Sequence, residues 1–243
     1  MRKIKKTPYI LAVIPARGGS KGIPNKNLKK IAGHTLVEHA IRVSLKCHLV
    51  YKTILSTDDS KIAKVGKKAG AIAPFLRPSR LASDKTKIVD VILHLLKHID
   101  DKPDIVLLLQ PTAPLRTSKQ ISEALQILIK NEKADAIISV VHLNEPHPIK
   151  IKTIKKGWLR SYLPKADSQI SRQLLPTVYK LNGAIYAVRT KALLNEKTFL
   201  PNKTLPYIMP PETGINIDTP LDLIILKSLV KSKVNSVLKY FSD

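Results

Sequence analysis

Short apolar runs alternate along this chain with longer segments in which apolar residues recur every three or four positions. Short runs rich in β-branched residues are typical of buried strands, and the periodic segments are typical of helices that bury one face. The predicted strands are Tyr9–Ile14, Lys52–Ser56, Ala71–Phe75, Ile105–Leu109, Ala136–Val141 and Ala184–Val188. Because apolar strands and helices alternate, we predict an α/β fold, a mostly parallel Rossmann-like sheet with helices on both faces.

The predicted helices begin with capping sequences. Two have the spacing of a capping box, in which Thr is followed three residues later by Glu or Gln: Thr35 with Glu38, and Thr117 with Gln120. Another begins at Asp58–Ser60 and should end near Gly70, because glycine readily takes the left-handed conformation that closes a helix. Further helical patterns cover Thr86–Ile99 and the chain from about Pro220 onward.

The alternation of strands and helices stops after Val141. Residues 142–180 contain four prolines and two short β-like pieces, Ile149–Ile154 and Trp158–Tyr162. We therefore predict an α/β core over residues 1–141, an excursion over residues 142–180, and completion of the core with a C-terminal helix over residues 181–243. The excursion carries several large apolar side chains, and we predict that a partner subunit covers them in a homodimer.

The chain is strongly basic, with 42 Lys and Arg against 18 Asp and Glu and a formal net charge of +24. Most of the cations are lysines spread along the whole chain. Aromatic residues make up only 5% of the sequence, so stacking platforms for nucleic-acid bases are scarce. The composition therefore argues against specific nucleic-acid binding and suits the attraction of anionic substrates.

Cysteine usage and the N-terminal sequence bear on the compartment. Cys47 is the only cysteine, so no intramolecular disulfide can form, and we expect a reducing compartment and a buried structural thiol. The basic residues 1–6 precede an apolar run that Pro15 and Arg17 interrupt, too short for a signal peptide. No run approaches the ~20 apolar residues of a membrane helix. We therefore expect a soluble, cytoplasmic protein without membrane association.

The segment after the first predicted strand carries the strongest chemical signal. Residues 15–27 read Pro-Ala-Arg-Gly-Gly-Ser-Lys-Gly-Ile-Pro-Asn-Lys-Asn, so Arg17, Lys21 and Lys26 lie among three glycines. Glycines let backbone amides approach an anion closely, and cations bind phosphate oxygens. The spacing matches neither the Walker phosphate loop nor the dinucleotide fingerprint. We predict a triphosphate site here; the alternative is a solvated, glycine-rich turn.

Polar segments also follow other predicted strands, at the sheet edge where ligands of parallel sheets collect. Gln110–Arg116, stiffened by two prolines, could read a nucleobase through Gln110 or be only a rigid connection. Asn182–Tyr186 places an amide and a hydroxyl beside another strand. Asp218 precedes the helix near Pro220, where a carboxylate is either a helix cap or, in a phosphate site, a ligand of Mg²⁺.

Together these segments resemble the CMP-sialic acid synthetases, the cytidylyltransferases that activate N-acetylneuraminate and related nonulosonic acids. The matching pieces are, in chain order, residues 15–27, Leu55–Asp58, Arg77–Asp84, Gln110–Arg116, His147–Lys150, Arg172–Gln173, Asn182–Tyr186 and Ile217–Asp222. Their ordered set spans residues 9 to about 225. The resemblance implies a nucleotidyltransferase fold, a homodimer, and transfer of CMP from CTP to the sugar's anomeric hydroxyl with release of pyrophosphate.

The resemblance also implies roles for individual residues. The triphosphate would be held by Arg17, Ser20, Lys21 and Asn27, with Lys26 close enough to share that work. The cytidine part would contact Arg77 and Gln110, with Gln110 nearest the sugar, and the boundary between nucleotide and sugar would be lined by Asn182 and Tyr186. From the excursion, Lys150 and Arg172 would reach the neighbouring subunit's site and attract the sugar's carboxylate. Asp218, with Asn216, would hold Mg²⁺.

Three departures from the family pattern matter. Asn216 replaces the first acid of the usual Asp-x-Asp pair, which removes one negative charge from the metal site. Leu174 follows Arg172-Gln173 in place of a polar residue, so the sugar pocket suits a less polar nonulosonate such as legionaminate. Lys87 and Ile88 replace small hydroxyl residues, which leaves the ribose contact unassigned.

Two alternatives stay open at this point. A ketodeoxyoctonate cytidylyltransferase carries Gln-Gly-Asp-Glu-Pro where this chain has Gln110-Pro-Thr-Ala-Pro, which counts against that acceptor. A catalytically dead nucleotide-binding or nucleic-acid-binding protein would account for Asn216 and for the high positive charge. Release of pyrophosphate from CTP in the presence of a nonulosonic acid separates these alternatives from the main prediction.

Overall fold

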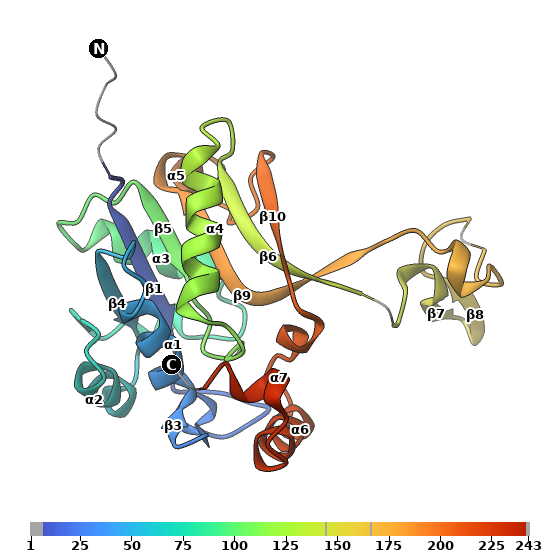
Figure 1. Cartoon of the computed structure of the whole chain (residues 1–243), viewed down its shortest axis with the longest axis horizontal. Coiled ribbons are helices and arrows are strands. Elements are labelled where there is room, and N and C mark those ends of the chain that lie inside the picture. The colour runs from blue at the N-terminus through green and yellow to red at the C-terminus, as the bar shows by residue number, and fades with distance from the viewer. Residues whose placement is uncertain (1–6, 144, 166, 242–243) are drawn as a thin grey trace.

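A six-stranded sheet crosses the middle of the protein (Figure 1). In the computed structural model, which describes residues 7–143, 145–165 and 167–241, its strands are β1 (Ile10–Pro15), β4 (Lys52–Ser56), β5 (Ile105–Leu108), β6 (Ala136–His142), β9 (Tyr179–Arg189) and β10 (Thr204–Met209). Their order is β10-β6-β9-β5-β1-β4, and all except β9 run parallel to one another. The predicted mostly parallel sheet is therefore confirmed.

The direction of β9 follows from its connection. A parallel neighbour needs a crossover, usually a helix packed on the sheet, whereas the chain between β6 and β9 leaves the core and returns beside β6. The first half of β9 pairs with β6 alone, and its second half also pairs with β5, with Tyr186 opposite Leu108. The middle of β9, around Gly183, consequently passes close to the carboxyl end of β5, where the Gln110 segment begins.

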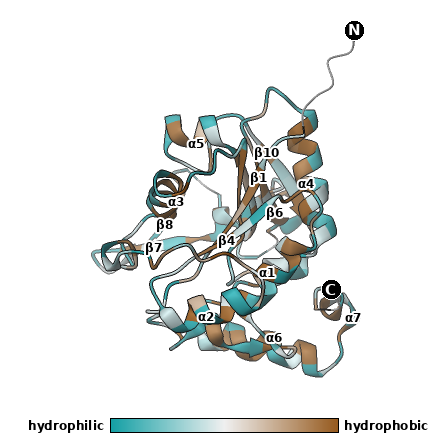
Figure 2. Ribbon diagram, turned by 90° about the vertical axis from the view of Figure 1, so that its left-hand side faces the viewer, coloured by the Kyte–Doolittle hydropathy of each residue, from teal (hydrophilic) through white to brown (hydrophobic). Residues whose placement is uncertain are grey.

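Helices cover both faces of the sheet (Figure 2). They are α1 (Leu36–Leu45), α2 (Ser60–Lys68), α3 (Ile88–Lys97), α4 (Ser118–Lys130), α5 (Thr190–Glu196), α6 (Pro220–Lys231) and α7 (Asn235–Leu238). Alternate residues of β1 point to opposite faces, so Ile10, Ala12 and Ile14 pack with α1, α2 and α4. Leu11 and Val13 pack on the other face with α3 and α5, and all five side chains are fully buried.

A third apolar cluster joins the C-terminal helices to the glycine-rich segment. Leu226 of α6 and Val237 of α7 pack with Ile23, Ile31 and Ile217. Ile31 belongs to a small hairpin of β2 (Lys30–Ile31) and β3 (His34–Thr35). The packing brings residues near 217 beside residues near 23, although they are distant in sequence.

The predicted helix starts are largely confirmed. Both Thr35 and Thr117 form complete capping boxes with the residues predicted for them. Asp59 caps α2, accepting hydrogen bonds from the amides of Lys61 and Ile62, and Gly70 beyond its end has a φ of 98°. Short 3₁₀ helices cover Lys26–Leu28, Ser79–Leu81, Pro148–Lys150, Arg172–Leu174 and Pro211–Gly214.

Two strand assignments were wrong. Residues Ala71–Phe75 form no strand: Ile72 makes one parallel bridge with Ile54, and Leu76 makes one with Thr57. Pro74 lies between these bridges and has no N–H to continue a ladder. Conversely, β10 was not predicted, and it contains Pro206, which an interior strand would not accommodate. That proline is tolerated because β10 is an edge strand that pairs with β6 alone.

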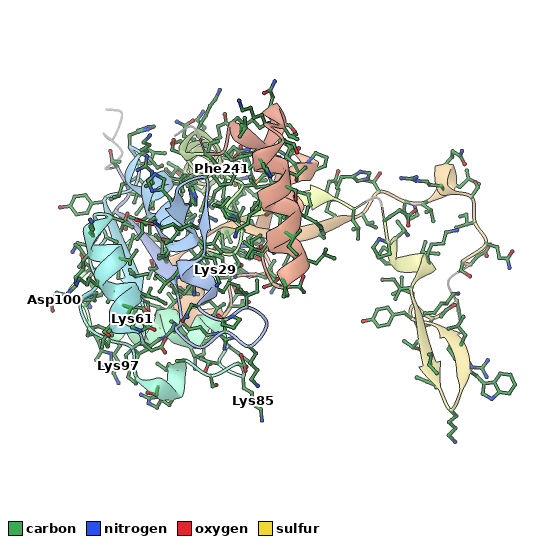
Figure 3. All side chains as sticks on the ribbon, turned by 90° about the horizontal axis from the view of Figure 1, so that it is seen from below. Lys29, Lys61, Lys85, Lys97, Asp100 and Phe241 are labelled. Carbon is green, nitrogen blue, oxygen red and sulfur yellow. The ribbon has the colours of Figure 1, made fainter. Side chains whose placement is uncertain are left out.

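The excursion projects away from the sheet between β6 and β9 (Figures 1 and 3). It contains a two-stranded hairpin of β7 (Lys152–Lys155) and β8 (Trp158–Ser161), close to the two predicted β-like pieces. Its large apolar side chains are exposed, with Ile154 at 75%, Trp158 at 68% and Leu159 at 67%. Within this single chain, the hairpin has no core of its own.

Other expectations concern the thiol, the N-terminus and membranes. Cys47 is buried, with its Sγ 3.2 Å from Ser122 Oγ, as expected for a structural thiol. Residues 1–6, the basic start that we rejected as part of a signal peptide, lie outside the described residues. Among the described helices, none combines the length and the apolar character that spanning a bilayer requires.

Candidate functional site

Loops at the carboxyl edge of the parallel strands enclose a pocket of about 350 Å³, at the lower end of the range for small-molecule sites. Eight of the residues with predicted roles line it: Arg17, Ser20, Lys26, Asn27, Arg77, Gln110, Asn216 and Asp218. They come from four separate stretches of sequence: the glycine-rich loop after β1, the segment around Arg77, the loop after β5 and the approach to α6. The fold thus brings together most of the predicted site.

The glycine-rich loop is held in place by side chains. Asn27 is buried and its Nδ2 donates to the carbonyl of Arg17 at 2.9 Å. The Gly18 amide donates to Asp58 Oδ1 at 3.2 Å, and a Cβ at Gly18 would lie 2.7 Å from Asp59 Oδ2. A Cβ at Gly22 would lie 2.7 Å from the carbonyl oxygen of Asp218. These close approaches give the glycines a steric role that an unconstrained, solvated turn would not need.

Asp84 neutralises two cations of the glycine-rich loop. Its Oδ1 lies 2.5 Å from Arg17 Nη2, and its Oδ2 lies 2.8 Å from Lys21 Nζ. The hydrogen bond from Lys21, followed by that from Arg17, lowers the pKa of the Asp84 carboxyl. Lys21 is highly exposed and, unlike Arg17 and Asp84, is outside the set of residues that line the pocket.

Arg77 lines the pocket, although its side chain is almost fully buried. Its Nη2 is 3.3 Å from Asp58 Oδ1, the same oxygen that accepts from the Gly18 amide. Burial lowers the pKa of Arg77, and the charge of Asp58 opposes this effect. Asp58 therefore connects the cation of one loop to the backbone of the other.

The loop after β5 contacts two other parts of the site. Gln110 lies against Gly183 of β9, since a Cβ at Gly183 would be 2.7 Å from Gln110 Oε1 and 3.1 Å from Asn216 Nδ2. The carbonyl of Thr112 accepts a hydrogen bond of 2.8 Å from the Ile217 amide. The Gln110 loop thereby fixes the backbone on which Asn216 and Asp218 stand.

Asp218 is not the cap of α6. That helix is capped by Thr219, which forms a capping box with Asp222, so the alternative role considered for Asp218 is wrong. The Asp218 carboxylate is instead 3.0 Å from Lys26 Nζ. Asn216 Oδ1 is buried without a hydrogen-bond partner among the described residues.

These two residues fit a magnesium ion by their chemistry. A carboxylate and an amide oxygen without a partner, beside a predicted phosphate loop, are the kind of donors that Mg²⁺ takes. The described residues contain no group of three or more His, Cys, Asp or Glu side chains arranged for a metal. Phosphate oxygens and water would therefore supply most of the ligands.

Five residues with predicted roles do not line the pocket: Lys21, Asn182, Tyr186, Lys150 and Arg172. Asn182 is fully buried, its Oδ1 accepting from Ser139 Oγ at 2.5 Å and its Nδ2 donating to Thr213 Oγ1 at 3.1 Å. Tyr186 is partly buried on β9, and burial raises its pKa. Their contacts with nucleotide or sugar stay predictions.

The two excursion residues lie apart from the core. Lys150 Nζ donates to the carbonyls of Ser168 and Ile170, each at 2.9 Å, and so closes a turn within the excursion. Arg172 is exposed at the start of a 3₁₀ helix. Their predicted contact with a sugar carboxylate in a neighbouring subunit stays a prediction.

Sequence reasoning did not assign roles to several other pocket residues. Asp84 ends one of the matching motifs, but its pairing with Arg17 crosses 67 residues and carries no local signal. Ser83 and Thr86, whose hydroxyl oxygens are 2.8 Å apart, also line the pocket. They supply hydroxyl groups next to Lys87 and Ile88, where the ribose contact could not be assigned.

The mostly parallel sheet, with a cation-bearing glycine-rich loop at its carboxyl edge, defines a protein of the nucleotidyltransferase class. A sequence profile described as Cytidylyltransferase matches residues 11–207. The chain belongs to this cytidylyltransferase family. The expectation of an enzyme of this kind, stated from the ordered motifs, is therefore confirmed.

Individual relatives and a solved structure agree with this assignment. The chain is 33% identical to a CMP-N,N'-diacetyllegionaminic acid synthase of Legionella pneumophila, covering 91% of this chain and 96% of the relative. It is 32% identical to an N-acylneuraminate cytidylyltransferase of Escherichia coli, covering 92% of this chain but 52% of that longer protein. A solved structure of a CMP:2-keto-3-deoxy-manno-octonic acid synthetase with CTP has a TM-score of 0.67 at 19% identity, covering 93% of this chain and 99% of that one, which shows the fold alone.

Proposed function

We propose that this protein joins CMP from CTP to the anomeric hydroxyl of a nonulosonic acid and releases pyrophosphate. The observation that carries the proposal is the single pocket into which Arg17, Lys26 and Arg77 converge with Gln110 and Asp218. This reaction requires cations that bind a triphosphate, an amide that binds a base or a sugar, and a carboxylate that binds a metal. The near full-length match to a CMP-N,N'-diacetyllegionaminic acid synthase supports a nonulosonic acid as acceptor.

The proposed chemistry is an in-line displacement at the α-phosphorus of CTP. The sugar hydroxyl oxygen forms a new bond to the α-phosphorus and loses its proton to water. The bond from the α-phosphorus to the oxygen that bridges it to the β-phosphorus breaks, and negative charge grows on the departing pyrophosphate. Arg17 and Lys21 bind these oxygens after exchanging Asp84 for them, and Ser20, Lys26 and Asn27 complete the loop. Catalysis then comes from orientation and from charge stabilisation that is already in place.

We propose Mg²⁺ as the cofactor, held by Asp218 with Asn216 as a neutral oxygen donor. When bound, the ion would neutralise phosphate charge. The chain's own residues support this arrangement: Thr112 holds the backbone of Ile217, and Lys26 already balances the charge of Asp218. Binding of a cation at Asp218 would release Lys26 to the phosphates.

The sugar side of the site is proposed to include a second subunit. Arg77 and Gln110 would contact the cytidine part, while Asn182 and Tyr186 would shape the boundary towards the sugar. Lys150 and Arg172 would reach the acceptor's carboxylate from the excursion of a partner chain, in a homodimer. The exposed apolar hairpin and its distance from the core in Figures 1 and 3 support this assembly. A cytoplasmic location stays a prediction, supported by the proposed use of CTP.

Pyrophosphate release with purified protein, millimolar CTP and Mg²⁺ tests the proposal. Acceptors are N-acetylneuraminate, legionaminate and pseudaminate, with ketodeoxyoctonate and no acceptor as controls. We expect release with at least one nonulosonic acid, and a loss of about 10- to 100-fold in Arg17→Ala and Lys21→Ala because each removes a charge-assisted hydrogen bond. Release with ketodeoxyoctonate alone would establish the alternative acceptor. CTP binding without release under any condition would contradict an active enzyme.

A further inference from the structure

Arg116 is among the largest fully buried side chains of the described protein, with 1% of its surface exposed. Its Nη1 donates to three backbone carbonyls: Gln110 at 2.8 Å, Ala113 at 2.6 Å and Ala184 at 3.3 Å. Two of these carbonyls belong to the loop after β5, and the third belongs to β9. One side chain therefore joins the loop to the strand beside it.

The buried charge of Arg116 is not balanced by an acid. None of the ion pairs of the described residues includes Arg116, and its Nε and Nη2 have no hydrogen-bond partner there. Burial lowers the pKa of Arg116 to about 9, because removing the charged guanidinium from water costs free energy. A well-packed apolar side chain would fill this volume without that cost. The guanidinium contributes hydrogen bonds to three backbone carbonyls, which an apolar side chain could not make.

These carbonyls lie next to three groups that the proposed function uses. Gln110 itself begins the loop, and Ala184 follows Gly183, on whose Cα face the side chains of Gln110 and Asn216 rest. Within the same loop, the Thr112 carbonyl holds the Ile217 amide between Asn216 and Asp218. Displacement of the loop would therefore move the proposed base contact and the proposed metal ligands together.

We propose that Arg116 is a positioning residue: it clamps the loop after β5 onto β9 and so keeps Gln110, Asn216 and Asp218 in one arrangement. The inference rests on the proposed function, and it goes beyond it by assigning a role to a residue that touches no substrate. All three carbonyls are bound by Nη1 alone, so lysine, which carries three donors on one nitrogen, keeps part of the clamp, whereas methionine keeps much of the volume without any donor.

Arg189 provides a matched control. Its guanidinium also binds three backbone carbonyls, with Nε 2.8 Å from Ala134 and Nη2 3.0 Å from Leu128 and 3.3 Å from Asn131. It stands opposite Ile105, at the amino end of β5 and therefore at the other edge of the sheet from the pocket. A purely structural arginine should behave like Arg189.

The experiment compares Arg116→Lys and Arg116→Met with Arg189→Lys and Arg189→Met. Thermal midpoints, kcat, KM for CTP and the half-saturating Mg²⁺ concentration are measured, together with amide hydrogen exchange of residues 110–116 and 215–218. We expect kcat/KM to fall by about 10- to 100-fold and the Mg²⁺ requirement to rise in folded Arg116→Met, with a smaller change in Arg116→Lys. Exchange should accelerate in both segments. Arg189 variants should lose thermal stability while keeping wild-type kinetics and slow exchange in these segments.

Several outcomes would overturn the proposal. Folded Arg116→Met with unchanged kinetics and exchange would leave Arg116 with the role of filling space only. If neither Arg116 variant folds while the Arg189 variants do, the residue is structural and the positioning role is rejected. Should the wild type release no pyrophosphate with any acceptor, the proposed function fails on its own, and the exchange comparison still decides whether Arg116 positions the two segments.

Discussion

At the scale of single residues, two carboxylates of the site neutralise three of its cations. Asp84 pairs with Arg17 and Lys21, and Asp218 pairs with Lys26. A bound triphosphate would replace Asp84 at the first two cations, and a bound metal would replace Lys26 at Asp218. Since Lys26 is then released towards the phosphates, metal and nucleotide should each increase the affinity for the other.

Asp84→Asn should tighten the binding of phosphate chains, because it removes a carboxylate that competes for Arg17 and Lys21. Pairs this exposed contribute little, so we expect a gain of about two- to fivefold in affinity for inorganic tripolyphosphate and for CTP by titration calorimetry. Asp101→Asn, which removes a carboxylate paired with Lys52 away from the pocket, is the control and should leave binding unchanged. Weaker binding by Asp84→Asn would mean that Asp84 itself contacts the ligand or its metal.

The metal proposal gives opposite expectations for two neighbouring positions. Asp218→Asn removes the only carboxylate proposed as a ligand, so turnover should fall by about 100-fold or more at saturating CTP. Asn216→Asp adds an anionic oxygen beside it and should lower the Mg²⁺ concentration for half-maximal rate. Magnesium titrations of initial rate measure both. Equal Mg²⁺ dependence in all three proteins would remove residues 216 and 218 from the metal site.

At the scale of elements, different residues at the start of α6 cap the helix and supply a carboxylate to the pocket. Thr219 and Asp222 satisfy the first amides of the helix, and the Asp218 amide also donates to Asp222 Oδ2 at 3.0 Å. The Asp218 side chain is thereby left to face the pocket and Lys26. The cap stabilises the helix and holds the backbone of Asp218, while the carboxylate remains available for chemistry.

Thr219→Ala should therefore destabilise the protein without changing its chemistry. Loss of an N-cap hydroxyl costs about 1 kcal/mol, which urea unfolding would show as a lower midpoint with the same slope. The Mg²⁺ dependence of the folded enzyme should stay close to wild type. Asp218→Asn, measured alongside, should show the reverse pattern, and a shared pattern would refute the division of roles.

At the scale of the whole molecule, the excursion sets the assembly that we propose. Its hairpin exposes Ile154, Trp158 and Leu159. The excursion, which carries Lys150 and Arg172, projects away from the sheet of its own chain (Figure 3). Each complete site would then combine the core of one subunit with the excursion of the other. Such an arrangement makes activity depend on association.

Mixing two inactive variants tests this sharing. Chains with Arg17→Ala have a defective core site, and chains with Lys150→Ala and Arg172→Ala have a defective excursion. After mixing and exchange of equal amounts, half of the dimers are mixed and each has one intact site, so about a quarter of wild-type activity should return. Sedimentation of the wild type should show a dimer at micromolar concentration. A 27.0 kDa species alone, or mixtures that stay inactive, would contradict the shared site.

Acid pH should destabilise the whole molecule for two reasons that act in the same direction. Hydrogen bonds from Lys21 and then Arg17 lower the pKa of Asp84, and those from Lys52 and then Tyr9 lower the pKa of Asp101. A carboxyl with a lowered folded-state pKa stabilises the fold above its unfolded pKa of about 4, and this stabilisation is lost as the pH falls through the folded value. Protonation also increases a net charge that is already +24.

Thermal melts from pH 7 to pH 3 measure this effect. The midpoint should fall most steeply below about pH 4, and added salt should raise it at low pH because it screens repulsion between the excess positive charges. Asp101→Asn should flatten the acid limb, since it removes one of the linked carboxyls. A midpoint independent of pH in this window would contradict the role of these ion pairs.

The sequence by itself determined the features whose signals are local. Apolar runs define β1, β4, β5 and β6. The starts of α1 and α4 are defined by a Thr that is followed three residues later by Glu or Gln. The glycine-rich loop and the ordered motifs were sufficient to predict the family. Such signals depend on neighbours within a few residues, where backbone propensity and capping chemistry decide the outcome.

The tertiary structure alone decided which distant groups meet. The sheet order places Asp84 on Arg17, the packing of α6 places Asp218 on Lys26, and the return of the chain from the excursion makes β9 antiparallel. An edge strand that contains Pro206 was not predicted, and Pro74 ended a ladder that the apolar pattern favoured. The contacts of the buried Arg116 guanidinium were likewise decided by the tertiary structure alone. Its three acceptors come together only when β5 and β9 lie side by side, because hydrogen bonds across a fold depend on how its elements pack and not on local sequence.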